Sequence, residues 1–409
     1  MELIHLPFEI LVNITEFLSS EDILNLSACS KHFYDLLFLV KFNEIVNFRD
    51  IYGSSYFNSF TNVVYDNISI YYASGKYISK FLPKSLRILY WTCYLPLPSQ
   101  LPETLITLRL DNQYNELLPS LPDSLKNLYL GLFYNQPLSK LPNSLENLDL
   151  GMIYNKQLPN LPDSLKRLNL SSDYNQPLAQ LSTSLKYLYL GTHYNHPLPK
   201  LPDSLKSLNL SDEYNHPLPR LPDSLKRLNL GDDYNHPLPE LPDSLKRLNL
   251  SSCYNHPLPT LPDSLKSLNL GTHYNYPLPR LPDSLKSLNL GNDYDQLLPK
   301  LSTSLKSLYL SCDYNQQLPQ LPNSLKILHL GHDYNQQLPE LPDSLESLHL
   351  GNNYSHQLLQ LPNSLESLWL DWCYNQQIPR LPNSLRHLKI WRKFSLRILS
   401  SDITVEFFD

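Results

Sequence analysis

The sequence predicts an α+β protein in which a small N-terminal bundle of three helices precedes a β-rich solenoid with one continuous parallel sheet. Two observations lead to this prediction. Residues 101–390 repeat a twenty-residue unit, fourteen times in full and once by half, without insertion or deletion. Such a short, fixed period is typical of a solenoid, in which each coil buries its apolar face against its neighbours. The first eighty residues lack the period and begin with apolar residues at helical spacing.

The predicted helical bundle occupies the N-terminal end of the chain. Pro7 suits the first position of a helix, and apolar residues follow it at helical spacing as far as Leu18. A second helix is expected after residue 20, because acidic residues there interact favourably with the dipole of a helix N-terminus. A third helix is expected from about residue 30. A bundle of this size usually depends on a partner for its stability.

The repeated unit reads approximately LPDSLKRLNLGDDYNHPLPE. If its opening Leu is position 1, apolar or aromatic residues stand at positions 1, 5, 8, 10, 14 and 18. The segment LxxLxL from position 5 to 10 is the strand signature of a leucine-rich repeat, because residues two apart on a strand point to the same face. Proline at positions 17, 19 and 2 removes backbone donors, which disfavours a helix on the opposite side of the coil. Each unit should therefore contain one short strand and an otherwise extended coil.

Position 14 is Tyr in every full unit and position 15 is Asn in most of them. We expect the tyrosine to pack under the turn, and the asparagine to bond to the backbone of the next coil, because stacked identical coils permit such ladders. Position 16 is His in four successive units, from His196 to His256. A column of residues cannot converge on one metal ion, so we interpret these histidines as turn residues. Asp163 and Ser164 likewise indicate a turn and not a catalytic pair.

Composition narrows the classes of function. The chain has 409 residues and a net charge of −6, so neither nucleic acid nor a membrane surface is a predicted partner. It begins without the pattern of a secretory signal, which leads us to expect a cytoplasmic or nuclear location. Its five cysteines include no CxxC pair, so no metal site is predicted. No motif for a catalytic site or a cofactor is found, and an enzyme is therefore not expected.

Positions 7 and 9 should point outward from the sheet, and here the units differ most. Position 9 is Asn in the middle of the array, but aromatic or basic residues replace it toward both ends. Because aromatic residues and Arg are the usual anchors of interfaces, this variation indicates a surface that binds a target protein. Ordinary tolerated substitution on an exposed sheet is the alternative. The candidate residues are Tyr129, Arg167, Tyr189, Arg227, Arg247, Tyr309, His329, His349, Trp369 and Trp372. Position 6 is mostly Lys, but Glu146, Glu346 and Glu366 argue against a uniform anion-binding stripe.

Residues 3–40 resemble an F-box, whose frame is Leu-Pro-x-Glu, an apolar helix, an acidic turn into a second helix, and a Cys-Ser segment before an aromatic residue. The matching residues here are Leu6, Pro7, Glu9, Ile14, Leu18, Asp22, Leu26, Cys29 and Phe33. The resemblance implies docking onto a Skp-type adaptor protein of a cullin-RING ubiquitin ligase. The residues that it implies for this contact are Leu6, Pro7, Ile10, Ile14, Leu18, Leu26 and Phe33.

The repeats resemble FNIP repeats, which pair an SLxxLxLG strand with a Tyr/Phe-Asn-x-Pro-Leu turn, as at 224–238. The combination is similar to proteins of amoebae and of the giant DNA viruses that infect them. It implies four regions: an F-box at 1–40, a linker or N-terminal cap at 41–81, repeats at 82–390, and a C-terminal cap at 391–409. The expected function is recognition of a protein substrate for a Skp-cullin-F-box ligase. A scaffold or decoy that sequesters the adaptor without promoting ubiquitination is the alternative.

Overall fold

The computed structural model describes residues 18–19, 22–23, 42–47, 59–66, 82–92, 95–371, 373–391 and 404–408. Every named secondary-structure element in these residues is a β-strand, and they form a parallel β-solenoid of leucine-rich-repeat type. The predicted α+β class is therefore wrong. Asp22 and Ile23 are helical, but no helix long enough to form an element is described, and almost all of the predicted three-helix bundle lies outside the described residues. Within these residues no helix has the length and apolar character needed to cross a membrane.

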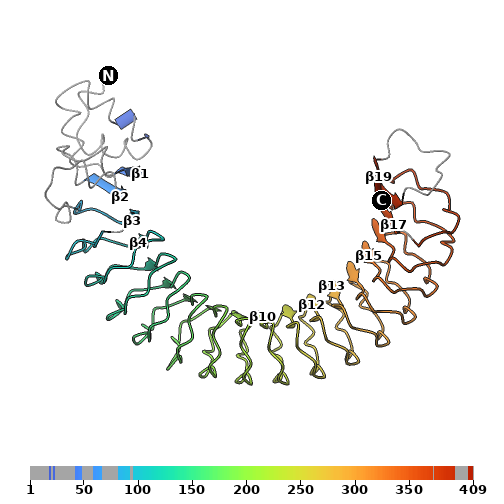
Figure 1. The fold of residues 1–409 in the computed structure, drawn as a ribbon, viewed down its shortest axis with the longest axis horizontal. Helices are drawn as coiled ribbons and strands as arrows, with labels where there is room; N and C mark the ends of the chain where they lie inside the picture. The colour runs from blue at the N-terminus through green and yellow to red at the C-terminus, as the bar shows by residue number, and fades with distance from the viewer. Residues whose placement is uncertain are drawn as a thin grey trace, which may run out of the picture. The chain divides into compact units, whose positions relative to one another are not determined.

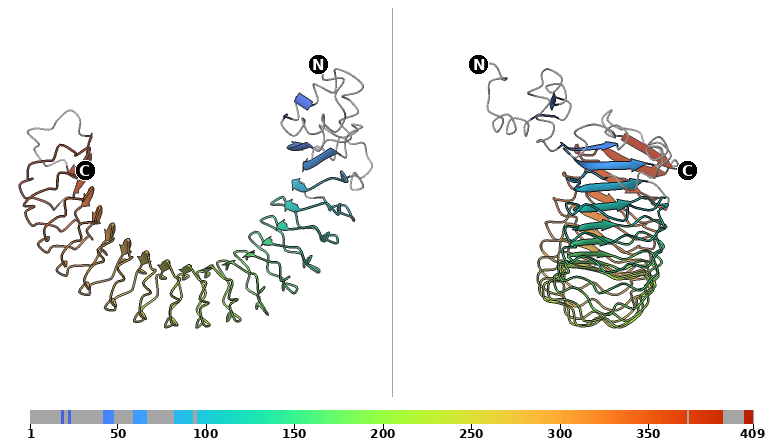
Figure 2. Two further views of the ribbon diagram at one scale, coloured as in Figure 1. Left: turned by 180° about the vertical axis from the view of Figure 1, so that it is seen from behind. Right: turned by 90° about the vertical axis from the view of Figure 1, so that its left-hand side faces the viewer.

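The chain forms two compact units, and the first comprises Met1–Tyr194. Its strands pair in parallel, each with the next along the chain (Figures 1 and 2). They are β1 (Phe42–Asn47), β2 (Phe60–Asp66), β3 (Ile88–Thr92), β4 (Thr107–Leu110), β5 (Asn127–Tyr129), β6 (Asn147–Asp149), β7 (Arg167–Asn169) and β8 (Tyr187–Tyr189). β1 and β2 lie before the first repeat, so part of the segment 41–81 extends the same sheet.

The second unit comprises Asn195–Asp409 and has the same topology. Its strands are β9 (Ser207–Asn209), β10 (Arg227–Asn229), β11 (Arg247–Asn249), β12 (Ser267–Asn269), β13 (Ser287–Asn289), β14 (Ser307–Tyr309), β15 (Ile327–His329), β16 (Ser347–His349), β17 (Ser367–Leu370), β18 (His387–Trp391) and β19 (Thr404–Phe408). Each pairs in parallel with its neighbour, in a register that places equal repeat positions side by side from β9 to β18. β19 adds a further strand to β18 after the period has ended.

Most strands cover only positions 7 to 9, because the sequence bends the backbone on both sides of them. Before the strand, the amide of position 5 donates to the carbonyl of position 2, as Leu165 does to Pro162 at 3.0 Å. After it, the amide of position 14 donates to the carbonyl of position 11, as Tyr174 does to Ser171 at 3.2 Å. The leucines at positions 5, 8 and 10 are buried in the core of every coil from residue 101 to 370. Each unit therefore forms one short strand and an extended segment that returns to the next strand.

The tyrosines at position 14 form the interior of the turn side, as predicted. Their rings are fully buried and stack on those of the neighbouring coils, with centroids 6.2 Å apart in the first unit and 6.1–6.4 Å apart in the second. Burial raises the pKa of Tyr154 and Tyr254 to about 12. These phenols are therefore neutral, and the column is held by packing and not by charge.

The asparagines at position 15 form the predicted ladder outside the tyrosines. The side-chain oxygen of Asn155 accepts the backbone amide of Asn175 at 3.0 Å, one coil further on, and the same bond recurs along both units. Asp295 replaces Asn without loss, because its carboxylate accepts the amide of Asn315 at 2.9 Å. This column supplies acceptors to backbone donors that no strand pairs.

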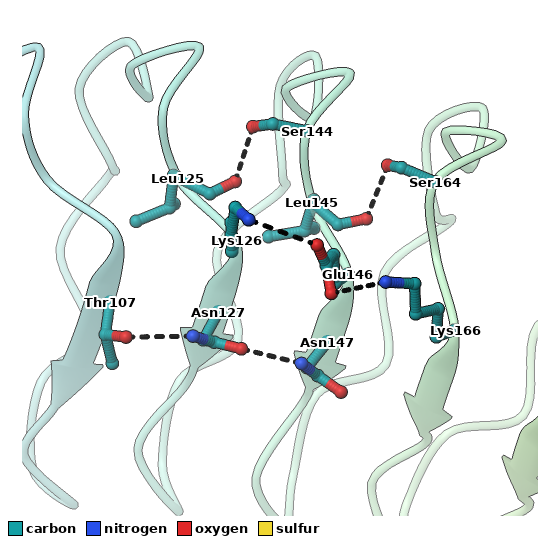
Figure 3. A network of polar contacts seen from close by, with 10 residues as sticks. All are labelled: Thr107, Leu125, Lys126, Asn127, Ser144, Leu145, Glu146, Asn147, Ser164 and Lys166. Carbon is teal, nitrogen blue, oxygen red and sulfur yellow. Dashed lines mark hydrogen bonds and ion pairs between the residues drawn. The ribbon is translucent and has the colours of Figure 1, made fainter.

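Further polar rows cross the coils on the strand side (Figure 3). Serine at position 4 donates to the carbonyl of position 5 in the preceding coil, as Ser164 does to Leu145 at 2.7 Å. Asn127 and Asn147 bond to each other through their side chains at position 7. The hydroxyl of Ser164 is thus committed to the stacking of coils, which agrees with its interpretation as a structural residue.

Gly151, at position 11, shows why that position is restricted to small residues in most units. Its φ is 75°, which disfavours any residue with a side chain, and a Cβ there would overlap the carbonyl oxygen of Gly131 in the preceding coil. Where Ser replaces Gly, its hydroxyl is used for stacking: Ser251 is buried and donates to the carbonyl of Tyr234 at 2.7 Å. The close approach of successive coils therefore restricts position 11 to small residues in most units.

Candidate protein-interaction surfaces

The face of the sheet that points away from the core is formed by positions 6, 7 and 9. In the strands, position 8 is buried while positions 7 and 9 are mostly exposed or half-buried. The parallel register aligns each position with itself in neighbouring coils, so every position forms a column. A substitution repeated in successive units thus becomes a continuous surface feature.

In the first unit, two arginine side chains lie over the rings of tyrosines in the next coil. The guanidinium of Arg167 lies 4.7 Å from the ring centroid of Tyr187 and 5.8 Å from that of Tyr189. Arg109 lies 5.8 Å from the ring of Tyr129 in the next coil. Such cation–π contacts fix the orientation of exposed side chains. We call Arg167, Tyr187 and Tyr189 the arginine–tyrosine cluster.

An exposed apolar patch lies at the carboxyl ends of strands in the same unit. Leu132, Phe133 and Met152 are 39%, 41% and 47% exposed, at positions where most other units have polar residues. The amide of Met152 donates to the carbonyl of Leu132, so the patch crosses two adjacent coils. These residues were not among the predicted site residues, because the prediction considered the strands and not the turns that follow them. A comparison of positions 12 and 13 between units would have found them.

In the second unit, five residues at position 9 form a row of contacts that we call the histidine–tryptophan cluster. They are Tyr309, His329, His349, Trp369 and Lys389. The ring centroids of successive aromatic members lie 5.9, 3.9 and 4.7 Å apart, and the ammonium of Lys389 lies 4.5 Å from the ring of Trp369. Trp369 is 39% exposed, and exposed aromatic side chains are the usual anchors of protein interfaces.

Electrostatics in this cluster depend on its two histidines. Nδ1 of His349 and Nε2 of His329 share a hydrogen bond, and Nε2 of His349 lies 3.5 Å from a carboxylate oxygen of Asp371. Burial, together with the neighbouring His349, lowers the pKa of His329 to about 4. His329 is therefore neutral near pH 7. Asp371 was also missed by sequence analysis, although it stands where most units have Gly or Ser.

The structure therefore places the predicted target-binding residues in separate groups. Tyr129 contacts Arg109, Arg167 and Tyr189 share one cluster, and Tyr309, His329, His349 and Trp369 share the other. Arg227 and Arg247 are exposed neighbours on β10 and β11. Trp372 lies outside the described residues. Of the predicted adaptor-binding residues only Leu18, which is half-buried, is described; Leu6, Pro7, Ile10, Ile14, Leu26 and Phe33 lie outside the described part of the chain.

The histidines of the turn column have structural contacts. His216, His236 and His256 each bond through Nε2 to the backbone carbonyl of an asparagine in the preceding coil, at 3.0–3.1 Å. Each ring also lies edge-on to the position-14 tyrosine of its own coil. These contacts support the interpretation as turn residues. In the part of the chain that the structure describes, no three His, Cys, Asp or Glu side chains are arranged to hold a metal ion.

Comparison with known structures places this fold among leucine-rich repeat proteins. CroV588, a giant-virus protein described as a circular leucine-rich repeat structure, is 29% identical with a TM-score of 0.66. The match covers 90% of this chain, which spans only 65% of the length of CroV588. YopM from Yersinia enterocolitica is 29% identical with a TM-score of 0.53, and 75% of this chain and 78% of YopM are covered. For YopM from Yersinia pestis, a leucine-rich effector protein, identity is 30%, TM-score 0.50, and coverage 66% and 84%.

Family models match both regions of the chain, whereas comparison with curated protein sequences gives no significant match. The F-box domain model matches residues 3–45. The FNIP Repeat model matches residues 114–153, 133–173, 154–193, 174–213, 194–220, 214–253, 254–293, 314–352 and 334–373. Together the FNIP matches span more than half of the sequence. The resemblance to both families is thereby confirmed, and the chain belongs to the FNIP-repeat family, with an F-box ahead of its repeats.

Proposed function

We propose that this protein is the substrate-recognition subunit of a Skp-cullin-F-box type ubiquitin ligase. The F-box would hold a Skp-type adaptor, the solenoid would hold a target protein, and other subunits of the ligase would perform the ubiquitin chemistry. The observation that carries the proposal is the union in one chain of an F-box match at 3–45 with a long FNIP-repeat solenoid. The role would require a location in the cytoplasm or nucleus of a host cell.

The strand face supports the target-binding half of this proposal. Both clusters present aromatic rings beside cations, the side chains that dominate the energy of protein interfaces. Their members are held in place by one another, so less side-chain entropy is lost on binding. The mechanism would be positioning: a bound target has a high effective concentration near the carrier of ubiquitin.

Binding to an immobilised Skp-type adaptor tests the first half. We expect a variant with Leu6→Asp, Pro7→Ala and Leu18→Asp to bind at least about thirtyfold more weakly, because charges would replace apolar contact residues. Leu297→Asp is the control, since Leu297 is 69% exposed on the solenoid. Circular dichroism should show an unchanged solenoid in both variants. Undiminished binding by the triple variant would refute the proposal.

Proteome-wide measurement of ubiquitinated lysines in host cells tests the second half. Expression of the wild type should raise the ubiquitination of specific proteins, and the F-box triple variant should abolish the increase. Trp369→Ala combined with Arg167→Ala should reduce it while adaptor binding persists. Adaptor binding without any increase in ubiquitination would instead support the decoy and contradict the substrate-recognition role.

A further inference from the structure

An unbroken row of lysines crosses the second unit at position 6. Seven successive coils contribute one each, and all but the first are exposed. We call them the lysine stripe: Lys206, Lys226, Lys246, Lys266, Lys286, Lys306 and Lys326. Arg227 and Arg247 are exposed at the adjacent position 7. The glutamates that interrupt position 6 lie outside this block, so the sequence-based objection to an anion-binding stripe does not apply within it.

The backbone holds the lysines of this stripe in a fixed column. The carbonyl of Lys226 accepts two amides from the next coil, those of Lys246 at 2.9 Å and Arg247 at 3.1 Å. The same pair of bonds recurs at Lys246, Lys266, Lys286 and Lys306. Neighbouring parallel strands lie about 4.8 Å apart, so like charges are stacked closely. Stacked like charges destabilise a sheet unless anions neutralise them.

Glutamates at position 6 relieve this repulsion where they interrupt or end a row of lysines. Lys326 pairs with Glu346 at one end of the stripe, and in the first unit Glu146 bridges Lys126 and Lys166 (Figure 3). Both lysines lower the pKa of Glu146 through hydrogen bonds and charge, Lys166 most strongly. Between Lys226 and Lys306, no carboxylate among the described residues lies within ion-pair distance of a stripe lysine. The fold thus provides positions for counter-charges and leaves five successive coils without them.

We propose that the lysine stripe binds an extended acidic segment of a target polypeptide. The inference rests on the proposed target-binding role of the solenoid and names the chemistry of the target. Carboxylates would pair with the stripe and with Arg227 and Arg247. The asparagines of position 9 run alongside; Asn249 donates one side-chain hydrogen to Asn229, and the second hydrogen of such an amide would bond to the backbone of the segment.

The flanking charges favour a polypeptide over a nucleic acid. Exposed aspartates at position 3, including Asp223, Asp243 and Asp263, run parallel to the lysines on one side. On the other side, the turns after the strands carry Asp232 and Asp233 and further acidic residues. A nucleic acid with phosphates on both edges would meet these carboxylates, whereas a single row of acidic side chains would meet only the lysines. The positive surface is thus a narrow band, formed by position 6 and, in two coils, also by position 7.

The length of the stripe sets the length of its ligand. Seven coils at about 4.8 Å span roughly 29 Å between the first and last lysine. An extended chain advances about 3.3 Å per residue, so about nine residues cover that distance. A segment of this length with acidic residues along one side would neutralise the whole stripe.

Fluorescence anisotropy with the full-length protein and a labelled twelve-residue peptide of alternating Glu and Ser tests the proposal. The stripe variant carries Lys246→Gln, Lys266→Gln and Lys286→Gln. The control carries Lys200→Gln, Lys300→Gln and Arg380→Gln, which removes equal charge from exposed residues at position 20. We expect saturable binding that weakens with added salt, at least about a tenfold loss in the stripe variant, and less than about a twofold loss in the control.

Three outcomes would overturn the proposal. The wild type could fail to bind the peptide, or the two variants could lose affinity equally, which would indicate a response to net charge alone. A labelled twelve-residue oligothymidylate could bind more tightly than the peptide and lose affinity in the stripe variant, which would indicate a nucleic-acid ligand. Thermal melting of each variant should show that it is folded. The F-box triple variant should keep peptide binding, so failure of the ligase function and failure of this inference can be told apart.

Discussion

The turn side and the strand face of this solenoid are built by the same twenty residues, yet they differ in how far the units are allowed to vary. On the turn side, every full unit has the buried tyrosine, and its asparagine gives way only to Asp295 and Ser355. On the strand face, position 9 includes Asn, Arg, Tyr, Asp, His, Trp and Lys. Side chains of the turn side contact the preceding and following coils, so each must fit two neighbours.

The difference teaches that contacts between coils restrict the turn side, whereas the outward residues of the strand face can differ from unit to unit. The stability of a solenoid comes from interactions within each unit and between nearest neighbours. An unfavourable residue on the turn side therefore weakens contacts with both the preceding and the following coil. The strand face contributes its leucines to the core, but its outward residues are free to differ. Clusters such as Arg167 with Tyr187 and Tyr189 form there without disturbing the stack.

Replacing a buried tyrosine should produce the largest loss of stability. Tyr274 is fully buried between Tyr254 and Tyr294, whereas Tyr276, two residues later, is 38% exposed. Tyr274→Ala should lower the free energy of unfolding by about 3–5 kcal/mol, because it removes a large aromatic group and leaves a cavity. Tyr276→Ala should cost less than about 1 kcal/mol. Urea denaturation followed by circular dichroism measures both, and equal losses would contradict the assignment of the turn column to stability.

Lowering the pH should destabilise the protein through His329 on the strand face. The expected loss of stability is smaller than that for Tyr274→Ala. The pKa of this group is lowered from 6.5 to about 4 in the folded protein, chiefly by burial and then by His349, while Asp371 opposes the shift. Between these values the unfolded chain binds a proton that the folded chain does not. Stability attributed to His329 is therefore complete above about pH 6.5 and falls as the pH drops toward 4.

The loss should amount to about 1–2 kcal/mol, below the full value for such a shift because the site is partly exposed. Melting temperatures measured from pH 7 to 4 should fall less steeply in His329→Gln than in the wild type. His356→Gln is the control, since His356 is exposed and bonds through Nε2 to the carbonyl of Asn335. If both variants keep the slope of the wild type, His329 is not the titrating group.

The sequence was sufficient for the parts of this molecule that repeat. Invariant spacing identified the strand, the buried tyrosine and the asparagine ladder, because each is a contact between identical neighbours whose geometry follows from the period alone. Position 9 also identified most members of the histidine–tryptophan cluster. Those residues all stand at position 9, and residues at the same position of the repeat can be identified from the twenty-residue period alone.

Contacts between different positions could not be found in this way. Asp371 reaches His349 from position 11, and the patch at Leu132 and Met152 lies in turns between the strand and the tyrosine. The α+β assignment was wrong because every named element in the described residues is a strand, and almost all of the three predicted helices lie outside those residues.

Removing one side chain of the asparagine ladder should have the smallest effect on stability. It also tests whether position 15 needs only a hydrogen-bond acceptor or specifically the amide group of Asn. Asn155→Ala removes the oxygen that accepts the backbone amide of Asn175 at 3.0 Å and the side-chain amide of Gln176 at 3.1 Å. The loss should be about 1 kcal/mol, because water can reach these exposed donors and replace part of the bond. Asn155→Asp should cost less than about half of that, since Asp295 already fills the same role for Asn315. Amide hydrogen exchange at Asn175 should accelerate in the alanine variant and remain slow in the aspartate variant. Equal acceleration in both would mean that the column depends on the amide group itself, so that its near-uniformity would reflect more than the need for an acceptor.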